Sequence, residues 1–450
     1  MQIAVTDSID GSVRGLLAHG VGGRQDLPIP FSSALIGAMV ALLATFLILG
    51  AAWRTSRFRG GQAGRPLPAG LAGFLDSAGL RWTLRAAGLL AAGWLVLALV
   101  AGPAATADNP AAGVLYVVMW VWVPVGSVLL GPVWRAVSPV RTVHLLLAAL
   151  SRTSPDRGPL RLPPGWGLWP AAATLFGFVW LELVPADRAT VPVVFLGFVT
   201  YAVVMLVGGA LVGSQWFARA DPFEVYSSLA ARLAPVGRRE DRVLVWRNPF
   251  EGLDSTPAVP GLAVVVLVLL GSTAFDSLSG STQWLRLLQD SRSPVLTGTL
   301  GLAGTIGALA VAYLLVVRAT GRLTDGRQRL PAQFAHSLLP IVLGYMVAHY
   351  YSLAVLEGQR TVILGLDPLG TGSHPLGLST VDVNPALVGA TTVVTVQVVA
   401  VVLGHIGGAV AAHDRAVRLF PPQAAQLGQL PLLLLMVGYT GLGLSLLFAA

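Results

Sequence analysis

Histidine, tyrosine and acidic residues inside apolar stretches are the parts of this chain that could do chemistry. The stretch 332–356 carries His336, Tyr345, His349 and Tyr350 among apolar residues. Because a polar side chain is expensive inside a bilayer, each of these is a hypothesis about function. Tyr345 and His349 lie four residues apart, so a helix would place them on one face. This stretch is therefore the first candidate for a functional site.

The histidines divide into groups by depth. His336 and His349 are 13 residues apart, which corresponds to ~20 Å along a helix at about 1.5 Å per residue. They cannot share one small ligand. His405, in the stretch 386–411, is expected with His336 near the inner leaflet as a second polar pair, whereas His413 is expected in solvent at a helix end. For each buried histidine, a hydrogen bond between helices is the alternative to a ligand role.

The outer group predicts a metal site. His349 would approach Asp276 at the end of the stretch 258–275, Glu357 just beyond its own helix, and His374 in the following loop. Imidazole and carboxylate ligands suit Zn, Cu, Fe or Ni, and such an ion can activate a bound water. The expected cofactor is a divalent Zn or Cu ion. The alternative is that the site holds no cofactor, because no compact ligand motif such as His-Glu-x-x-His occurs.

Two acids could carry protons instead of binding a metal. Asp276 is a ligand, a proton carrier or a helix-end residue that reaches water, and Glu182 in the stretch 168–184 raises the same question more weakly. Arg360 is the expected partner if one of these carboxylates is structurally paired. Pro340 removes a backbone donor, so we expect it to kink its helix.

Composition defines the class of protein that must position these side chains. Only 11% of the 450 residues are charged and 54% are apolar, with a mean hydropathy of +0.72, whereas soluble domains are about 25% charged. The absence of cysteine excludes disulfides and thiolate chemistry. We predict an all-α transmembrane helix bundle in residues 31–450, with about ten spans, after an extracytoplasmic head in residues 1–30. The expected spans are 31–53, 86–105, 111–134, 168–184, 191–213, 258–275, 295–317, 332–356, 386–411 and 429–449.

Arginine placement predicts how the bundle is inserted. All 29 basic residues are arginine, and 23 of them lie in the loops after the first, third, fifth, seventh and ninth spans. Because such loops stay in the cytoplasm, both termini are expected on the extracytoplasmic side of a bacterial plasma membrane. The arginines then mark the cytoplasmic loops and are expected to contact the lipid bilayer. Nucleic acid is not an expected partner.

Two of the arginine-rich loops open with the same chemistry. Ser138-Pro139 and Asp221-Pro222 each combine a capping side chain with a proline suited to the first helical turn. Apolar residues follow at matching offsets, so we expect interfacial amphipathic helices here. The 83-residue offset suggests a weak internal repeat of the units 86–150 and 168–233. The residues expected on the wet faces are Arg141, His144, Glu224 and Ser228.

Short stretches along most of the chain share a pattern with one bacterial family. They are Ala18-His19-Gly20 with Arg24-Gln25-Asp26-Leu27-Pro28-Ile29-Pro30, Asp221-Pro222-Phe223, Arg247-Asn248-Pro249, Ala274-Phe275-Asp276, Ala335-His336-Ser337-Leu338 with Pro340, and Ala348-His349-Tyr350. In these stretches the sequence resembles the integral membrane proteins named fenitrothion hydrolases.

This resemblance implies hydrolysis of an apolar phosphotriester by a metal-activated water at an outward-facing site. His349 and Asp276 would be metal ligands, and His19 or His374 would complete the site from outside. The candidate catalytic side chains are Tyr345, Tyr350 and Glu357. The chain lacks the clustered His-x-His pairs of a dinuclear hydrolase.

The rival hypothesis is a permease or a proton- or ion-coupled transporter for a small solute or a metal ion. It would use the same buried histidines and acids as proton or substrate sites near a helix broken at Pro340. A scaffold for other membrane proteins, with neither activity, is the third possibility.

Overall fold

The computed structural model describes residues 27–323, 330–372 and 382–448, most of which are helical. Nine segments in these residues are long and apolar enough to cross a membrane. The predicted all-α, multi-pass bundle is therefore confirmed. The nine segments contain α2 (Phe31–Ala52), α4 (Ala78–Ala101), the continuous helix of α5 (Ala111–Gly113), η4 (Val114–Trp122) and α6 (Val123–Leu130), α10 (Val191–Val212), α14 (Leu262–Ser279), α16 (Pro294–Leu323), α18 (Leu339–Leu366), α19 (Ala390–Leu419) and α21 (Leu430–Leu447).

The remaining expected span is a shorter apolar helix. α9 (Trp169–Leu183) has 15 residues, so it is ~22 Å long, whereas a bilayer core is about 30 Å thick. Its last turn carries Glu182, which is buried. A short loop then leads into α10.

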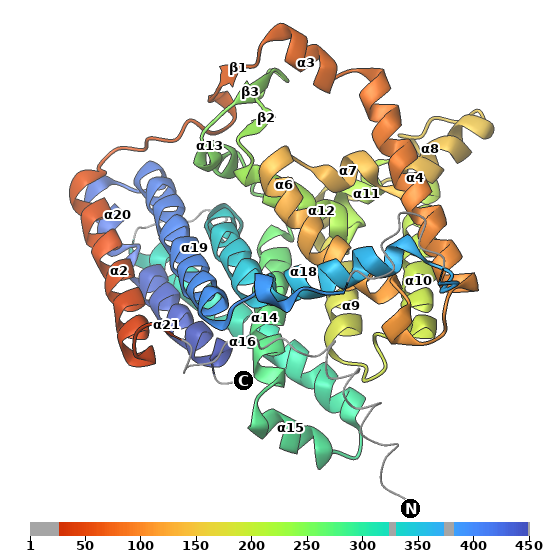
Figure 1. Cartoon of the computed structure of the whole chain (residues 1–450). Coiled ribbons are helices and arrows are strands. Elements are labelled where there is room, and N and C mark those ends of the chain that lie inside the picture. The colour runs from red at the N-terminus through yellow and green to blue at the C-terminus, as the bar shows by residue number, and fades with distance from the viewer. Residues whose placement is uncertain (1–26, 324–329, 373–381, 449–450) are drawn as a thin grey trace, which may run out of the picture.

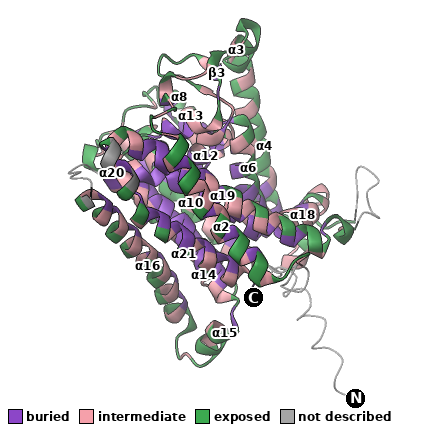
Figure 2. Cartoon of the chain, turned by 90° about the vertical axis from the view of Figure 1, so that its left-hand side faces the viewer, coloured by how far each residue is buried: buried purple, intermediate pink, exposed green. Residues whose placement is uncertain are grey.

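α14 and α18 belong to the most enclosed of the long apolar segments; Figure 2 shows that buried residues gather in the interior of the bundle. In the most apolar part of each of these two segments, 78% and 72% of the residues are buried inside the protein, against 17% in both α10 and α16. The peripheral helices thus present apolar side chains to lipid, while α14 is enclosed by other helices. A polar group on α14 or α18 therefore needs partners within the protein.

α18 and α19 pack closely because glycines face each other. A Cβ atom on Gly344 would meet the carbonyl oxygen of Ala400 at 2.4 Å, and one on Gly404 would meet that of Pro340 at 2.7 Å. Neither position has room for a side chain. Close approach at small residues is a common way for helices to associate in lipid.

The helix that carries His349 changes type just before Pro340. α17 (Leu330–Phe334) leads into the 3₁₀ turn η7 (Ala335–Leu338), and α18 then begins at Leu339. Pro340 lies in the first turn of α18, where its missing N–H would have no helical partner in any case. A change of helix type therefore occurs at this place, and the expected kink stays a prediction.

α18 is also longer than predicted. It continues to Leu366, ten residues past the expected end. Glu357 and Arg360 are consequently helical rather than part of an outer loop. The last turns of α18 run toward α4 (Figure 1), where Gly365 lies beside Trp94.

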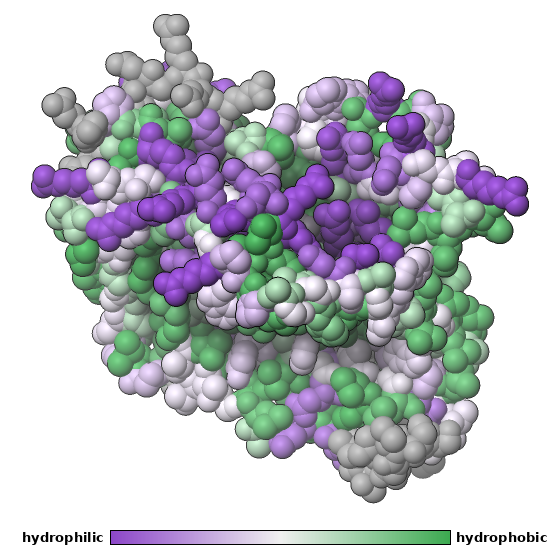
Figure 3. Space-filling model, turned by 90° about the horizontal axis from the view of Figure 1, so that it is seen from above, coloured by the Kyte–Doolittle hydropathy of each residue, from purple (hydrophilic) through white to green (hydrophobic). Residues whose placement is uncertain are grey.

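One side of the molecule, which we call the arginine-rich side, carries a small antiparallel sheet. The strands are β1 (Arg65–Pro66), β2 (Val236–Arg238) and β3 (Leu244–Trp246), in the order β1-β3-β2, close to α13 (Pro249–Asp254). Viewed from above, this side shows a concentration of hydrophilic residues (Figure 3). The side is defined by the described parts of the arginine-rich connections, 54–85, 135–161, 219–247, 318–323 and 415–418.

A polar network joins helices on the arginine-rich side. Asp414 of α19 accepts hydrogen bonds from Trp53 Nε1 at 3.0 Å and from Ser56 Oγ at 2.8 Å. Arg418 bridges Asp414 and Asp254, at 3.0 Å and 2.8 Å. These contacts connect the end of α2 and the end of α13 to α19.

The prediction that His413 lies in solvent was wrong. Its side chain is buried, with Nδ1 3.0 Å from Gln429 Oε1 and Nε2 2.9 Å from the carbonyl oxygen of Trp53. The charged neighbours of His413 in the sequence suggested an exposed helix end. The end of α2 covers this part of α19, so the same charges lie in a protein interior.

The two predicted capping motifs do begin helices. Ser138 accepts a hydrogen bond from the backbone N–H of Arg141 at the start of α8 (Pro139–Leu150). Asp221 does the same for Phe223 at the start of α12 (Pro222–Ala230). Burial raises the pKa of the Asp221 carboxyl to about 6.

The segments that precede these helices have the same backbone geometry. Gly131, after α6, has φ 96° and ψ −169°, and Gly213, after α10, has φ 88° and ψ −172°. Glycine is the residue that adopts this region readily. A short helix then leads to each cap: α7 (Val133–Val137) and α11 (Gln215–Ala220). The two units therefore share backbone geometry as well as capping chemistry.

The expected wet faces of α8 and α12 are largely buried. Arg141 and Glu224, which occupy equivalent positions 83 residues apart, form an ion pair at 2.7 Å with side-chain exposures of 11% and 2%. His144 is also buried, with Nε2 2.9 Å from the carbonyl oxygen of Pro155. The prediction that Arg141, His144 and Glu224 lie on wet faces was wrong, because these side chains face protein groups instead of water.

We predict that Glu224→Gln destabilises the protein, because it leaves the Arg141 guanidinium buried without its counter-charge. The expected loss is about 3 kcal/mol, the lower end of the range for breaking a buried pair. The thermal unfolding midpoint of the purified protein measures it. Asp241→Asn, which breaks the exposed Arg239–Asp241 pair, is the control and should have an effect of about 0–1 kcal/mol. Equal shifts in the two variants would contradict a structural role for the buried pair.

Candidate functional site

Three helices bring four polar side chains together in the middle of the bundle. Glu182 comes from the last turn of α9, Asp276 from the last turn of α14, and His349 and Tyr350 from α18. Their exposures are 7%, 6%, 4% and 2%. We call these four residues the central cluster.

The members of the central cluster form a continuous chain of short contacts. His349 Nε2 lies 2.7 Å from Asp276 Oδ2, the distance of a charge-assisted hydrogen bond. Tyr350 Oη lies 3.1 Å from the same oxygen and 3.2 Å from Glu182 Oε1. The tyrosine hydroxyl thus bridges two carboxyl groups on different helices.

The bridge at Tyr350 constrains where protons can be. A hydroxyl group carries one proton, so Tyr350 can donate to only one of the two carboxyl oxygens. The other contact is favourable only if that carboxyl group is protonated and donates to the tyrosine oxygen. Two ionised carboxylates so close together in a buried site would also repel each other strongly. The geometry therefore favours a protonated carboxyl group at one end of the bridge.

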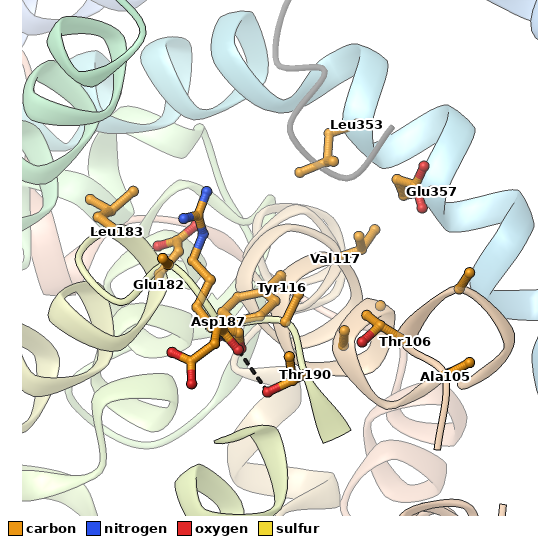
Figure 4. A pocket seen from close by; sticks show the side chains of 16 residues that line it. Ala105, Thr106, Tyr116, Val117, Glu182, Leu183, Asp187, Thr190, Leu353 and Glu357 are labelled. Carbon is orange, nitrogen blue, oxygen red and sulfur yellow. Dashed lines mark hydrogen bonds between the residues drawn. The ribbon is translucent and has the colours of Figure 1, made fainter. Parts of the chain in front are cut away.

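A cavity of about 280 Å³ lies beside the central cluster (Figure 4). Of the four cluster residues, Glu182 alone lines it. Glu182 Oε2 is buried and has no hydrogen-bond partner among the described residues, while Oε1 faces Tyr350. Glu182 therefore connects the cavity to the rest of the cluster.

The cavity lies on the side opposite the arginine-rich side. Its walls include residues 105–107 after α4, residues 186–190 after α9, and Tyr116 and Val117 of η4. In Figure 4, Tyr116 and Val117 lie between Glu182 and Glu357. η4 is a π-helix of nine residues, a rare conformation that is often found at functional sites.

The structure brings together some of the predicted site residues and separates others. His349, Asp276 and Tyr350 meet in the central cluster, and Glu357 lines the neighbouring cavity. Tyr345 faces α21 instead, where its ring packs at 5.7 Å from that of Tyr439. His19 and His374 lie outside the described residues.

The second predicted pair, His336 and His405, is placed in the interior of the protein. His336 Nδ1 lies 2.8 Å from the carbonyl oxygen of Gln333, and His405 Nδ1 lies 2.8 Å from that of Val401. Each histidine therefore has a partner in the preceding turn of its own segment. Arg360, expected to pair with Asp276 or Glu182, instead lies 3.5 Å from Glu357.

The described residues provide only part of the predicted metal site. His349 and Asp276 contact each other directly, and no group of three histidine or acidic side chains suited to a metal occurs in residues 27–323, 330–372 and 382–448. The Zn or Cu cofactor stays a prediction, and no step proposed below uses it.

A serine next to Asp276 completes a set that is typical of nucleophilic hydrolases. Ser277 Oγ lies 3.5 Å from His349 Nδ1, on the opposite edge of the ring from Asp276. This distance is long for a hydrogen bond. Ser277 is buried and does not line the cavity, so a substrate there would not reach its hydroxyl.

Sequence reasoning undervalued Glu182 and missed Tyr116 and Arg188, which also line the cavity. An acid within an apolar stretch was the signal for Glu182, as for Asp276. No such signal marked Tyr116, because a tyrosine in an apolar helix is ordinary core composition. Arg188 had no signal either, because it lies outside the arginine-rich loops.

Comparisons of the chain with protein-family models, curated proteins and solved structures found no match. The resemblance to the fenitrothion hydrolases stays a prediction.

We predict that infrared spectra contain the carbonyl band of a buried, protonated carboxylic acid that belongs to the bridge at Tyr350. Glu182→Gln should remove or displace this band, and Tyr350→Phe should shift it because the hydrogen bond is lost. Asp290→Asn, at an exposed acid on the same side of the molecule, should leave it unchanged. A spectrum identical in Glu182→Gln and the native protein would contradict a protonated Glu182.

Proposed function

We propose that the protein is a proton-coupled transporter of a small solute that occupies the cavity beside Glu182. The observation that carries this proposal is the bridge at Tyr350, which connects a carboxyl group at the cavity wall to the buried Asp276–His349 pair. Buried ionisable groups within membrane spans are characteristic of proton relays in transporters.

The hydrogen-bonded chain allows a proton to move without large displacements. A proton that arrives at Glu182 Oε2 leaves Oε1 free to pass its own proton to Tyr350 Oη. Tyr350 passes its hydroxyl proton to the Asp276–His349 pair. That pair holds the added proton as a carboxylate beside an imidazolium, which is neutral overall and so suits a buried site.

The position of the cavity favours transport over hydrolysis. A hydrolase of the predicted kind would need its substrate to contact His349 and Asp276. In the described residues, these two lie behind Glu182 and do not line the cavity. The cavity therefore gives a solute access to one end of the proton chain rather than to a reacting centre.

The two sides of the molecule differ in a way that suits alternating access. The cavity lies opposite the arginine-rich side, while the network around Asp414 joins α2 and α13 to α19 on the other side. The 3₁₀ turn η7 lies between this network and His349. Such turns often mark hinges within helices, and broken helices are common at the binding sites of transporters.

Because the chain has no cysteine, single cysteines can report which side of the protein is open. Thr190→Cys lies at the cavity, and Ser337→Cys lies in η7, buried on the other side of the cluster. In proteoliposomes, a membrane-impermeant maleimide should label these two positions reciprocally as pH changes, because protonation of Glu182 changes which side is open. Glu182→Gln should remove the pH dependence.

Two exposed positions are the controls for this labelling. Asp290 follows α15 (Thr282–Gln289) and Glu240 lies between β2 and β3, at opposite ends of the molecule in Figure 1. Both residues are exposed, so cysteines there should label at every pH and report the orientation of the protein. The proposal is wrong if Ser337→Cys stays unlabelled under all conditions. It is also wrong if the reciprocal pattern persists in Glu182→Gln.

A further inference from the structure

We infer that the cavity binds small organic ammonium ions and that each bound cation replaces a proton on Glu182. The inference deepens the proposed function by naming the class of solute, and it implies exchange of a cation for a proton. Only the coupling of this exchange to transport rests on the proposed function. Cation binding can be measured without any assumption about transport.

The unpaired oxygen of Glu182 is the first observation behind this inference. Nearly every buried polar atom in a folded protein has a hydrogen-bond partner, so a lone buried oxygen requires an explanation. Glu182 Oε2 has no partner among the described residues and belongs to a residue that lines the cavity. A donor in the cavity would supply the missing hydrogen bond once the Glu182 side chain turns Oε2 toward it. An ammonium group supplies both the donor and the opposite charge.

The other charges of the cavity also favour a cation. Glu182, Asp187 and Glu357 line it, and Arg188 is the only basic residue among its lining residues. The Glu357 carboxylate has Arg360 at 3.5 Å, outside the cavity lining. The charge available to a solute is therefore negative when the acids are ionised.

The size and surface of the cavity limit the solute to a small amphipathic molecule. A volume of about 280 Å³ lies just below the range of about 300–1,000 Å³ that is typical of ligand pockets. Most of the lining is apolar, including Val117, Leu183 and Leu353. Short alkyl groups would therefore contact these side chains while the ammonium group contacts Glu182.

Binding of a cation and protonation of Glu182 exclude each other. In the empty protein, a proton on Glu182 satisfies the contact with Tyr350. An ammonium group beside Oε2 stabilises the carboxylate instead, so the proton leaves Glu182 for water in the cavity. Tyr350 then donates to only one of the two ionised carboxyl groups, and the ammonium group compensates the charge of Glu182. No covalent bond other than the O–H bond breaks, and the added positive charge is balanced by the released proton. The titratable or charged groups near Glu182 or in the same cavity are Tyr116, Asp187, Arg188, Tyr226, Asp276, Tyr350 and Glu357.

Calorimetric titration of the purified full-length protein with ethylammonium tests this inference. Ethylammonium keeps its own proton near neutral pH, since its amine resembles that of lysine. Titrations in buffers with different ionisation enthalpies then count protons that come from the protein. We expect saturable binding with release of a proton for each bound cation. Ethanol and acetate, of similar size but neutral and negative, should not bind.

Three variants make the expected result specific. Glu182→Gln should weaken ethylammonium binding about ten- to a hundredfold, as for loss of a charged hydrogen bond, and should abolish proton release. Arg188→Gln should strengthen binding because it removes a like charge. Asp290→Asn should match the native protein. Circular dichroism and gel filtration show whether each variant is folded.

Several outcomes would overturn the inference. They are absence of ethylammonium binding by the native protein, binding without proton release, and unchanged affinity in folded Glu182→Gln. Reciprocal cysteine labelling without ethylammonium binding would mean a transporter for another class of solute. Binding with proton release but without reciprocal labelling would support the cation site and contradict transport.

Discussion

A single hydroxyl proton placed between two buried carboxyl groups is the constraint on which the central cluster depends. Tyr350 contacts Glu182 and Asp276 at hydrogen-bond distance, yet it can donate to only one of them. Both contacts of Tyr350 are therefore favourable only with an additional proton. A cation at Glu182 can replace the charge of this proton but not its hydrogen bond to Tyr350. Because Glu182 also lines the cavity, protons from the solvent and cationic solutes can approach it there.

The rest of the bundle isolates this constraint from lipid and water. α14 and α18 are enclosed by the other helices, so the polar groups that they carry interact mainly with one another. Glycines at the α18–α19 contact hold the backbone of the histidine-bearing helix close to its neighbour. On the arginine-rich side, Asp414 and Arg418 join three segments that are distant in the sequence.

The helical class could be predicted from the sequence, because apolar blocks of bilayer length rarely form anything other than membrane helices. The approach of Asp276 to His349 was also predicted. Sequence reasoning could not predict the bridge, since Glu182 and Tyr350 are 168 residues apart and only packing of α9 against the central helices joins them. It was wrong about His413 and Glu224 for one common reason. Charged residues in loops were taken as solvated, whereas neighbouring segments cover them in the folded chain.

Nitrogen NMR of the His349 imidazole tests the central claim most directly, because it reports the far end of the chain while the change is made at the cavity. The native protein, Glu182→Gln, Tyr350→Phe and the double variant would be compared at one pH. The account predicts that Glu182→Gln changes the chemical shifts of the His349 ring nitrogens, and that this effect disappears when Tyr350 is replaced. Identical His349 shifts in the native protein and Glu182→Gln would contradict it.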